Sequence, residues 1–246
     1  METTTKQKTN GESAITIGEI VAQNFRNAEI FEKYGIDFCC GGKISLEDAC
    51  RKKGINVLQI KKELDSVKSQ STLASYDFNL WELDFLCDYI VNTHHKYVVQ
   101  SMPVIFEYTQ KVAKVHGENH PEAIEIAEIF LKVMDEINHH MMKEENILFP
   151  YIKQMVQAKK NGLQISSPFG TVQNPIRMME HEHDVVGGFC KKINELSGNH
   201  TPPADACTTF RLSYLKLKEF ETDLHQHIHL ENNILFPKAV AMESAV

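Results

Sequence analysis

The 246-residue sequence has no long apolar run and no excess of basic residues. No segment approaches the roughly 18 uninterrupted apolar residues that a membrane-spanning helix requires. Lys and Arg total 26 against 33 Asp and Glu, and the resulting net charge of −7 argues against a nucleic-acid-binding protein. Residues 1–13 are polar and lack the apolar stretch of a secretion signal. We therefore expect a cytoplasmic protein that binds neither nucleic acid nor membranes.

Cysteine is scarce and irregularly placed. The six cysteines neither form the pattern of a disulfide framework nor show the CxxC spacing of a structural zinc site. Two of them, Cys39 and Cys40, are adjacent and are followed by two glycines in an expected loop. Two interpretations stay open for this pair. They are either exposed thiols that exchange, reduce a partner or hold iron in transit, or packed side chains in a tight turn that the glycines permit.

The distribution of glycine, proline and serine predicts an all-α protein with two folded parts. Residues 1–14 are expected to be a disordered polar tail, residues 15–67 a small helical domain with the Cys-Cys-Gly-Gly loop, and residues 68–77 a linker. Residues 78–246 contain long helical patterns joined by short connections, which indicates an antiparallel four-helix bundle. The four helices are expected at 78–115 with a kink at Pro103, 121–157 with an interruption near Pro150, 175–196 and 205–239.

Histidine, in contrast, is abundant: the sequence has 12, most of them in doublets or alternating pairs late in the chain. Two stretches that carry them nearly repeat, because HMMKEENILFP at 140–150 matches HIHLENNILFP at 227–237 in seven of eleven positions. Another histidine precedes each stretch at a similar distance, His95 by 45 residues and His183 by 44. Each half of the bundle therefore offers a histidine on its first helix and an HxxxE motif on its second.

The HxxxE spacing places both side chains on one face of a helix, because residues four apart lie roughly 5–6 Å from each other at Cβ. The apolar stripes of the helices predict which histidines of each cluster face the interior. They leave four others on the polar side: His139, His181, His225 and His229. On the first helix both His94 and His95 fit the stripe, and only the half-repeat spacing favours His95. The resulting candidates are His95, His140, Glu144, His183, His227 and Glu231.

Four imidazoles and two carboxylates that point into one bundle predict a metal site. A single buried histidine is more often a hydrogen-bonded core residue, but six such groups without a cation would carry a large desolvation cost. Imidazole and carboxylate without thiolate suit iron or manganese, and bundle cores hold di-iron carboxylate centres. Glu136 and Glu182 lie near candidate ligands. They are expected either to line an iron path or accept hydrogen bonds from the ligands, or to be solvated surface glutamates.

The part of the chain after the expected linker resembles hemerythrin-like domains. The whole chain resembles the iron–sulfur cluster repair di-iron proteins, also called the Repair of Iron Centres family. The motifs that carry the resemblance are YGIDFCCGGK at 34–43, HMMKEENILFP, EHD at 182–184 and HxxLENNILFP. The resemblance implies two iron ions per chain, in an oxo- or hydroxo-bridged centre held by the six candidates. It also implies a cytoplasmic role in restoring iron–sulfur clusters damaged by nitric oxide or peroxide, with the damaged proteins as clients.

Two departures separate this sequence from the oxygen-carrying hemerythrins. Gly187 stands where they have a fifth histidine, and the last motif ends in Glu231 at i+4 where they have aspartate at i+5. These differences leave open coordination positions and put reversible dioxygen carriage in doubt.

Three functions are compatible with such a site. The first is iron supply for cluster repair, and the alternatives are a di-iron enzyme that reduces nitric oxide or dioxygen and a gas or redox sensor. The sequence leaves homodimer formation open.

Overall fold

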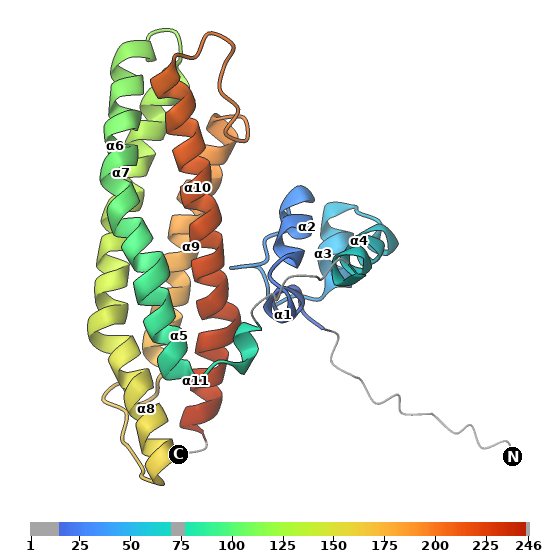
Figure 1. Ribbon diagram of the computed structural model, residues 1–246, viewed down its shortest axis with the longest axis vertical. Coiled ribbons are helices and arrows are strands. Elements are labelled where there is room, and N and C mark those ends of the chain that lie inside the picture. Colours follow the sequence, from blue (N-terminus) through green and yellow to red (C-terminus); the bar gives the residue numbers. More distant parts are fainter. Residues whose placement is uncertain (1–14, 70–76, 245–246) are drawn as a thin grey trace, which may run out of the picture. The chain divides into compact units, whose positions relative to one another are not determined.

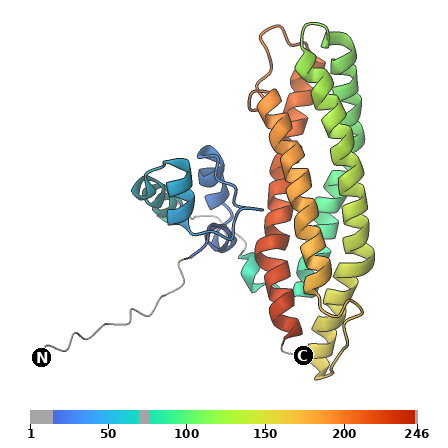
Figure 2. The same cartoon turned by 180° about the vertical axis from the view of Figure 1, so that it is seen from behind.

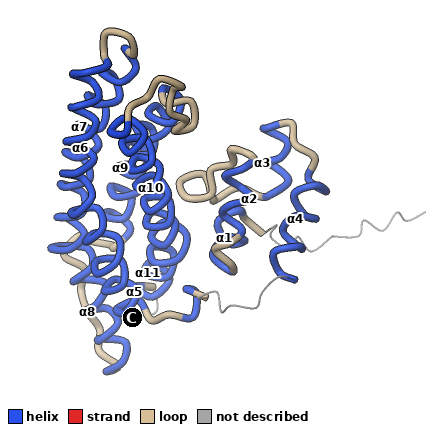
Figure 3. The backbone as a smooth tube through the Cα atoms, turned by 45° about the horizontal axis from the view of Figure 1, so that its top comes forward, coloured by secondary structure: helices blue, strands red, loops and turns tan. Residues whose placement is uncertain are grey.

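The computed structural model describes residues 15–69 and 77–244, and among these every regular element is helical (Figure 3). Within the same residues the nearest approach to a strand is one isolated bridge between Thr16 and Ser45. The prediction of an all-α fold is therefore confirmed. No helix in the described part combines the length and apolarity needed to cross a bilayer.

The chain divides into two compact units, residues 1–76 and residues 77–246 (Figure 1). The division falls at the end of the stretch in which the sequence predicts a linker. The expected tail at 1–14 and most of the expected linker at 68–77 lie outside the described residues.

The described residues of the first unit form four helices: α1 (Ile17–Gln23), α2 (Asn27–Lys33), α3 (Leu46–Lys53) and α4 (Val57–Ser69). A capping box begins α1, because the Thr16 hydroxyl accepts from the Glu19 backbone N–H and the Glu19 carboxylate accepts from the Thr16 backbone N–H. The loop between α2 and α3 carries Cys39 and Cys40 and packs buried Phe38 into this unit. Cys39 is buried and Cys40 is partly buried, so the expectation of two exposed thiols is wrong for Cys39.

Four rods of helix build the second unit (Figures 1 and 2). A short 3₁₀ turn, η1 (Phe78–Leu80), precedes them. The first rod is α5 (Leu83–Ile90), the π segment η2 (Val91–His95) and α6 (Lys96–His116). The second is α7 (Pro121–Lys143), the π segment η3 (Glu144–Leu148) and α8 (Phe149–Asn161). The third is α9 (Gln173–Leu196), and the fourth is α10 (Thr208–Leu230), the π segment η4 (Glu231–Leu235) and α11 (Phe236–Glu243).

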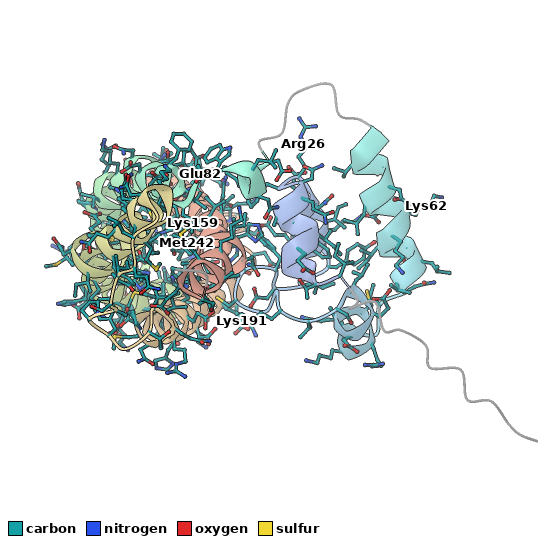
Figure 4. All side chains as sticks on the ribbon, turned by 90° about the horizontal axis from the view of Figure 1, so that it is seen from below. Arg26, Lys62, Glu82, Lys159, Lys191 and Met242 are labelled. Carbon is teal, nitrogen blue, oxygen red and sulfur yellow. The ribbon has the colours of Figure 1, made fainter. Side chains whose placement is uncertain are left out.

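The rods pack as an antiparallel bundle around a common interior. Helix α6 packs against α7 and α10, and α7 packs against α9, while the connections 117–120, 162–172 and 197–207 reverse the chain between successive rods. Seen from one end, the side chains of the rods fill the space between them (Figure 4). This interior is mainly apolar and contains large aromatic residues such as Phe130, Phe149 and Phe220. The prediction of a C-terminal four-helix bundle is thereby confirmed.

The two prolines that the sequence analysis marks lie in different surroundings. Pro103 lies inside α6, which continues through it to His116. The first rod departs from α-helical geometry at the π segment η2, before Pro103. Pro150, near which the second helix was expected to be interrupted, sits in the first turn of α8, directly after η3. These wide turns matter because they lie at the candidate ligands.

Candidate metal centre

Three of the four rods leave α-helical geometry where candidate ligands lie. Segment η2 ends at His95, and segments η3 and η4 begin at Glu144 and Glu231. Pro150 and Pro237 follow the last two, and in an α-helix each proline ring would clash with the carbonyl four residues earlier. A π turn widens the helix at that point and adds a residue to the turn. The shared sequence ILFP therefore accounts for the matching wide turns in the two halves.

The six candidate ligands meet in the bundle interior as two overlapping groups, and within each group the ligand atoms lie within 4.8 Å of one another. The first position comprises His95, His227, Glu144 and Glu231, and the second position comprises His140, His183, Glu144 and Glu231. All of these side chains are buried. Because both glutamates belong to both groups, the geometry describes two adjacent cation positions that share two carboxylates.

Each shared carboxylate approaches one imidazole of each position. Glu231 Oε1 lies 3.1 Å from His227 Nε2, and its Oε2 lies 3.1 Å from His183 Nε2. Glu144 Oε2 lies 3.4 Å from His95 Nε2 and 3.3 Å from His140 Nε2. The two oxygens of Glu231 thus face different positions, which is the arrangement of a bridging carboxylate.

The spacing of the imidazoles fits a metal ion at each position. The two Nε2 atoms lie 3.1 Å apart at the first position and 3.0 Å apart at the second. Bonds of roughly 2.1 Å from one cation to two nitrogens at a right angle would place those nitrogens about 3.0 Å apart. In addition, both oxygens of Glu144 are buried without a hydrogen bond from any described residue. An ionised carboxylate in that state is costly unless a cation neutralises it.

Hydrogen bonds on the outer side of the ring orient three of the four imidazoles. In each, Nδ1–H donates to a side-chain oxygen, so that the Nε2 lone pair faces the cation position. The pairs are His95 with Glu145 Oε1 at 2.7 Å, His140 with Glu182 Oε2 at 3.0 Å, and His183 with Asn232 Oδ1 at 2.9 Å. The fourth imidazole, His227, makes no hydrogen bond at Nδ1 within the described residues.

Nearby carboxylates favour the protonated form of His140. Burial lowers the pKa of the His140 imidazole, but the carboxylates of Glu144 and Glu182 outweigh burial and raise that pKa to about 10. The hydrogen bond from His140, aided by an ion pair with Lys143, lowers the pKa of Glu182 to about 2. A cation that binds to His140 competes with a proton for the same nitrogen, so metal affinity should rise as the pH rises.

The structure places His95, and not His94, in the ligand groups. His94 is buried beside it, with Nδ1 2.9 Å from Asp223 Oδ1. The His94 ring stacks on that of His227, with 5.6 Å between the centroids. The two glutamates that the sequence places near candidate ligands also differ in their contacts. Glu182 contacts a candidate ligand, as described above, whereas Glu136 is exposed and belongs to neither group.

His229 does not lie on a polar face as expected: its side chain is fully buried. The reason is that four consecutive residues, 227–230, are all buried, so this stretch of the fourth rod is covered on every side. An apolar stripe cannot reveal such a stretch, because the stripe assumes that one face of the helix meets solvent. His229 Nδ1 lies 3.2 Å from Asn233 Nδ2, within the same rod.

Comparison with known proteins gives a consistent result for both units. Residues 88–239 match the family model described as the hemerythrin HHE cation binding domain. Residues 14–68 match ScdA_N, described as a domain of unknown function (DUF542). The chain is 36% identical over 213 residues to the "Probable iron-sulfur cluster repair protein" of Haemophilus influenzae, which covers 86% of this chain and 90% of that protein.

Two further relatives carry the name "Iron-sulfur cluster repair protein YtfE". The relative from Enterobacter sp. is 37% identical over 92% of this chain and 97% of its own length. The relative from Musicola paradisiaca is 34% identical over 97% of this chain and 99% of its own length. The chain belongs to the iron–sulfur cluster repair family. The resemblance stated from the sequence motifs is thereby confirmed, and the matched cation-binding domain contains all six candidate ligands.

Sequence reasoning missed two residues of this family member that orient the ligands, Glu145 and Asn232. In a regular α-helix Glu145 would lie one residue off the inward face, so helical periodicity gave no reason to place it near the ligands. A signal was nevertheless present in the near-repeat, because the two residues directly follow Glu144 and Glu231 at equivalent positions. In the structure they make equivalent contacts, each accepting from the histidine on the first helix of its own half.

Proposed function

We propose that this chain repairs damaged iron–sulfur clusters by supplying iron from two iron ions held in its bundle. The observation that carries the proposal is the pair of buried positions that share Glu144 and Glu231. The names of the relatives support the repair role, and the imidazole and carboxylate donors suit iron. When bound, the ions would supply iron for rebuilding a cluster. The proposed ligands are His95, His140, Glu144, His183, His227 and Glu231.

The chain's own residues do three things in this proposal. The shared carboxylates hold the two ions together, and the outer acceptors keep the imidazoles turned toward them. Two carboxylates neutralise only part of the charge of two divalent or trivalent ions, which is compatible with iron that can leave. None of the six cysteines, all of which lie in the described residues, forms a disulfide, and this supports the proposed cytoplasmic location because thiols stay reduced in that compartment.

The Cys39–Cys40 loop is the proposed place where iron is handled outside the bundle. The two Sγ atoms lie 4.0 Å apart, and Asp37 Oδ1 lies 3.2 Å from Cys39 Sγ. Two sulfurs bound to one tetrahedral ion at roughly 2.3 Å would lie about 3.8 Å apart, so these three side chains could hold a cation in transit. Gly41 is needed for this turn, because a Cβ there would lie 2.9 Å from the Asp37 carbonyl oxygen. We therefore extend the proposed transfer role of the two cysteines to Asp37.

The double variant Cys39→Ser with Cys40→Ser tests this role. We expect it to keep the iron content of the bundle, because no thiolate belongs to either cation position. Reactivation of an iron–sulfur hydratase damaged by nitric oxide should fall severalfold, measured as recovered activity together with iron transferred to the client. Cys207→Ser is the matched control, since Cys207 is an exposed thiol far along the sequence in the other unit. Full reactivation by the double variant would contradict the transfer role, and loss of bundle iron would place the cysteines in the metal site.

A second candidate function is reduction of nitric oxide or dioxygen at the same ions. The observation that favours it is a cavity of about 310 Å³ with an almost wholly apolar lining, which includes Ile147 and Leu148, three and four residues after Glu144 in the second rod. Small uncharged gases suit such a lining better than charged substrates do. Mixing the reduced, iron-loaded chain with nitric oxide, an excess of an electron donor and an acceptor protein without its cluster separates the two functions. Repeated turnover to nitrous oxide supports the enzyme, and iron that appears on an acceptor protein supports supply.

A further inference from the structure

We infer that the two cation positions are unequal, and that the ion held by His95 and His227 is the more weakly bound and leaves first. The inference rests on the proposed pair of iron ions and names the ion that repair would use. It comes from comparing the two halves of the bundle, which the near-repeat makes equivalent position by position.

The two halves correspond in a simple way. In the second and fourth rods, residues 87 apart are equivalent, so that His140 corresponds to His227 and Glu144 to Glu231. In the first and third rods, His95 corresponds to His183, and the residues directly before them, His94 and Glu182, correspond to each other. The ligands keep this symmetry, because each position takes one histidine from a first helix and one from a second helix.

The symmetry fails at the pair His94 and Glu182. At the second position Glu182 accepts the Nδ1–H of His140 at 3.0 Å and fixes the plane of that ring. At the first position the equivalent residue is His94, which stacks on His227 with 7° between the ring planes. A stacked imidazole offers no acceptor in the plane of the His227 ring, and His227 Nδ1 has no hydrogen-bond partner within the described residues. The carboxylate of Asp223 contacts His94 instead, one ring away from the ligand.

The remaining outer contact of the first position is also the more solvated one. Glu145, which accepts from His95, has 42% of its side chain exposed, whereas Glu182 has 16%. Asn232, which accepts from His183, is buried. Water can therefore compete for the acceptor at the first position, while both acceptors of the second are shielded. Loss of one such outer partner typically weakens metal binding by roughly 10–100-fold. We expect a difference of that size between the two positions.

Release of iron to a chelator tests the inference. The full chain, loaded with ferrous iron in the absence of oxygen, is mixed with excess ferrozine, and the coloured chelate is followed with time. We expect two phases of equal amplitude whose rates differ by roughly 10–100-fold. His227→Gln should retain one ion that leaves at the slow rate. The equivalent variant, His140→Gln, should retain one ion that leaves at the fast rate.

Glu182 provides a second test that leaves the ligands in place. Glu182→Leu removes the acceptor for His140 and should speed the slow phase until it approaches the fast one. Glu182→Gln keeps an acceptor oxygen and should restore two phases, an outcome that a merely structural role for Glu182 would not produce. Glu128→Gln, at an exposed position of α7, is the control that should change neither phase.

Each outcome decides the matter. A chain that holds two ions and releases them in one phase contradicts the inference and leaves the proposed repair function standing. Fast release from His227→Gln, or slow release from His140→Gln, shows that the order is reversed. A chain with two release phases that nevertheless transfers no iron to damaged clients supports the inference and contradicts the repair function. A chain that binds no iron contradicts both.

Discussion

Glu144→Gln and Glu231→Gln are each expected to empty both cation positions, not only one. Glutamine keeps the shape of the side chain and removes its negative charge. Because each carboxylate belongs to both positions, the loss weakens both ions together. The effect should exceed the roughly 10–100-fold that loss of an outer hydrogen-bond partner causes. Iron per chain, measured by plasma emission after desalting, should fall close to zero.

Two comparisons make this result specific to the bridging role. Glu145→Gln should keep both ions with weaker binding, because the amide oxygen can still accept from His95 Nδ1. Glu128→Gln, on the same rod but exposed, should keep the iron content of the unaltered chain. If Glu144→Gln or Glu231→Gln retained one tightly bound iron, the carboxylates would not be shared, and the two positions would have to be independent sites.

Removal of the ions should lower the melting temperature of the bundle by roughly 8–16 °C. A ligand at 1,000 times its dissociation constant stabilises the folded state by about 4 kcal/mol. In a domain of this size each kcal/mol shifts the midpoint by roughly 2–4 °C. The physical reason is that the ions bind the folded bundle, in which Glu144 and Glu231 are held together in the interior, and not the unfolded chain. The only tryptophan of the chain, Trp81, lies in the bundle unit, so its fluorescence reports this transition separately.

The control for this prediction is chelation of the Glu144→Gln variant. That variant should melt at the same temperature with and without chelator, because it has no ions to lose. An unaltered chain whose melting temperature does not depend on chelator would show that the buried carboxylates are stabilised by protein groups alone. The metal centre would then contribute nothing to folding.

The bundle and most of its candidate ligands were predictable because their signal is periodic. Four long helices and two copies of HxxxE are set by local sequence, and the structure brings the six predicted side chains together. His95 needed the half-repeat, since His94 is buried as well and fits the same stripe. Whether the six side chains bind iron remains a prediction.

What the sequence did not reveal depends on departures from regular geometry. The π turns at η2, η3 and η4 each shift the helical phase by one residue, so a wheel drawn at 3.6 residues per turn misplaces their neighbours. That shift helps to explain why Glu145 reaches His95 although it lies off the inward stripe. His229 was misplaced for another reason, because the fourth rod is buried on every side near its ligands.

The central claim is that two iron ions share Glu144 and Glu231, and iron analysis combined with X-ray absorption spectroscopy tests it most directly. The account predicts two irons per chain and a scattering contribution from a second iron at the roughly 3.5–4 Å, or slightly less, that is typical of two-metal sites. Nitrogen and oxygen should surround each iron, with no sulfur neighbour. A single iron per chain, an iron without a second iron nearby, or stoichiometric zinc in protein from iron-replete cells would contradict it.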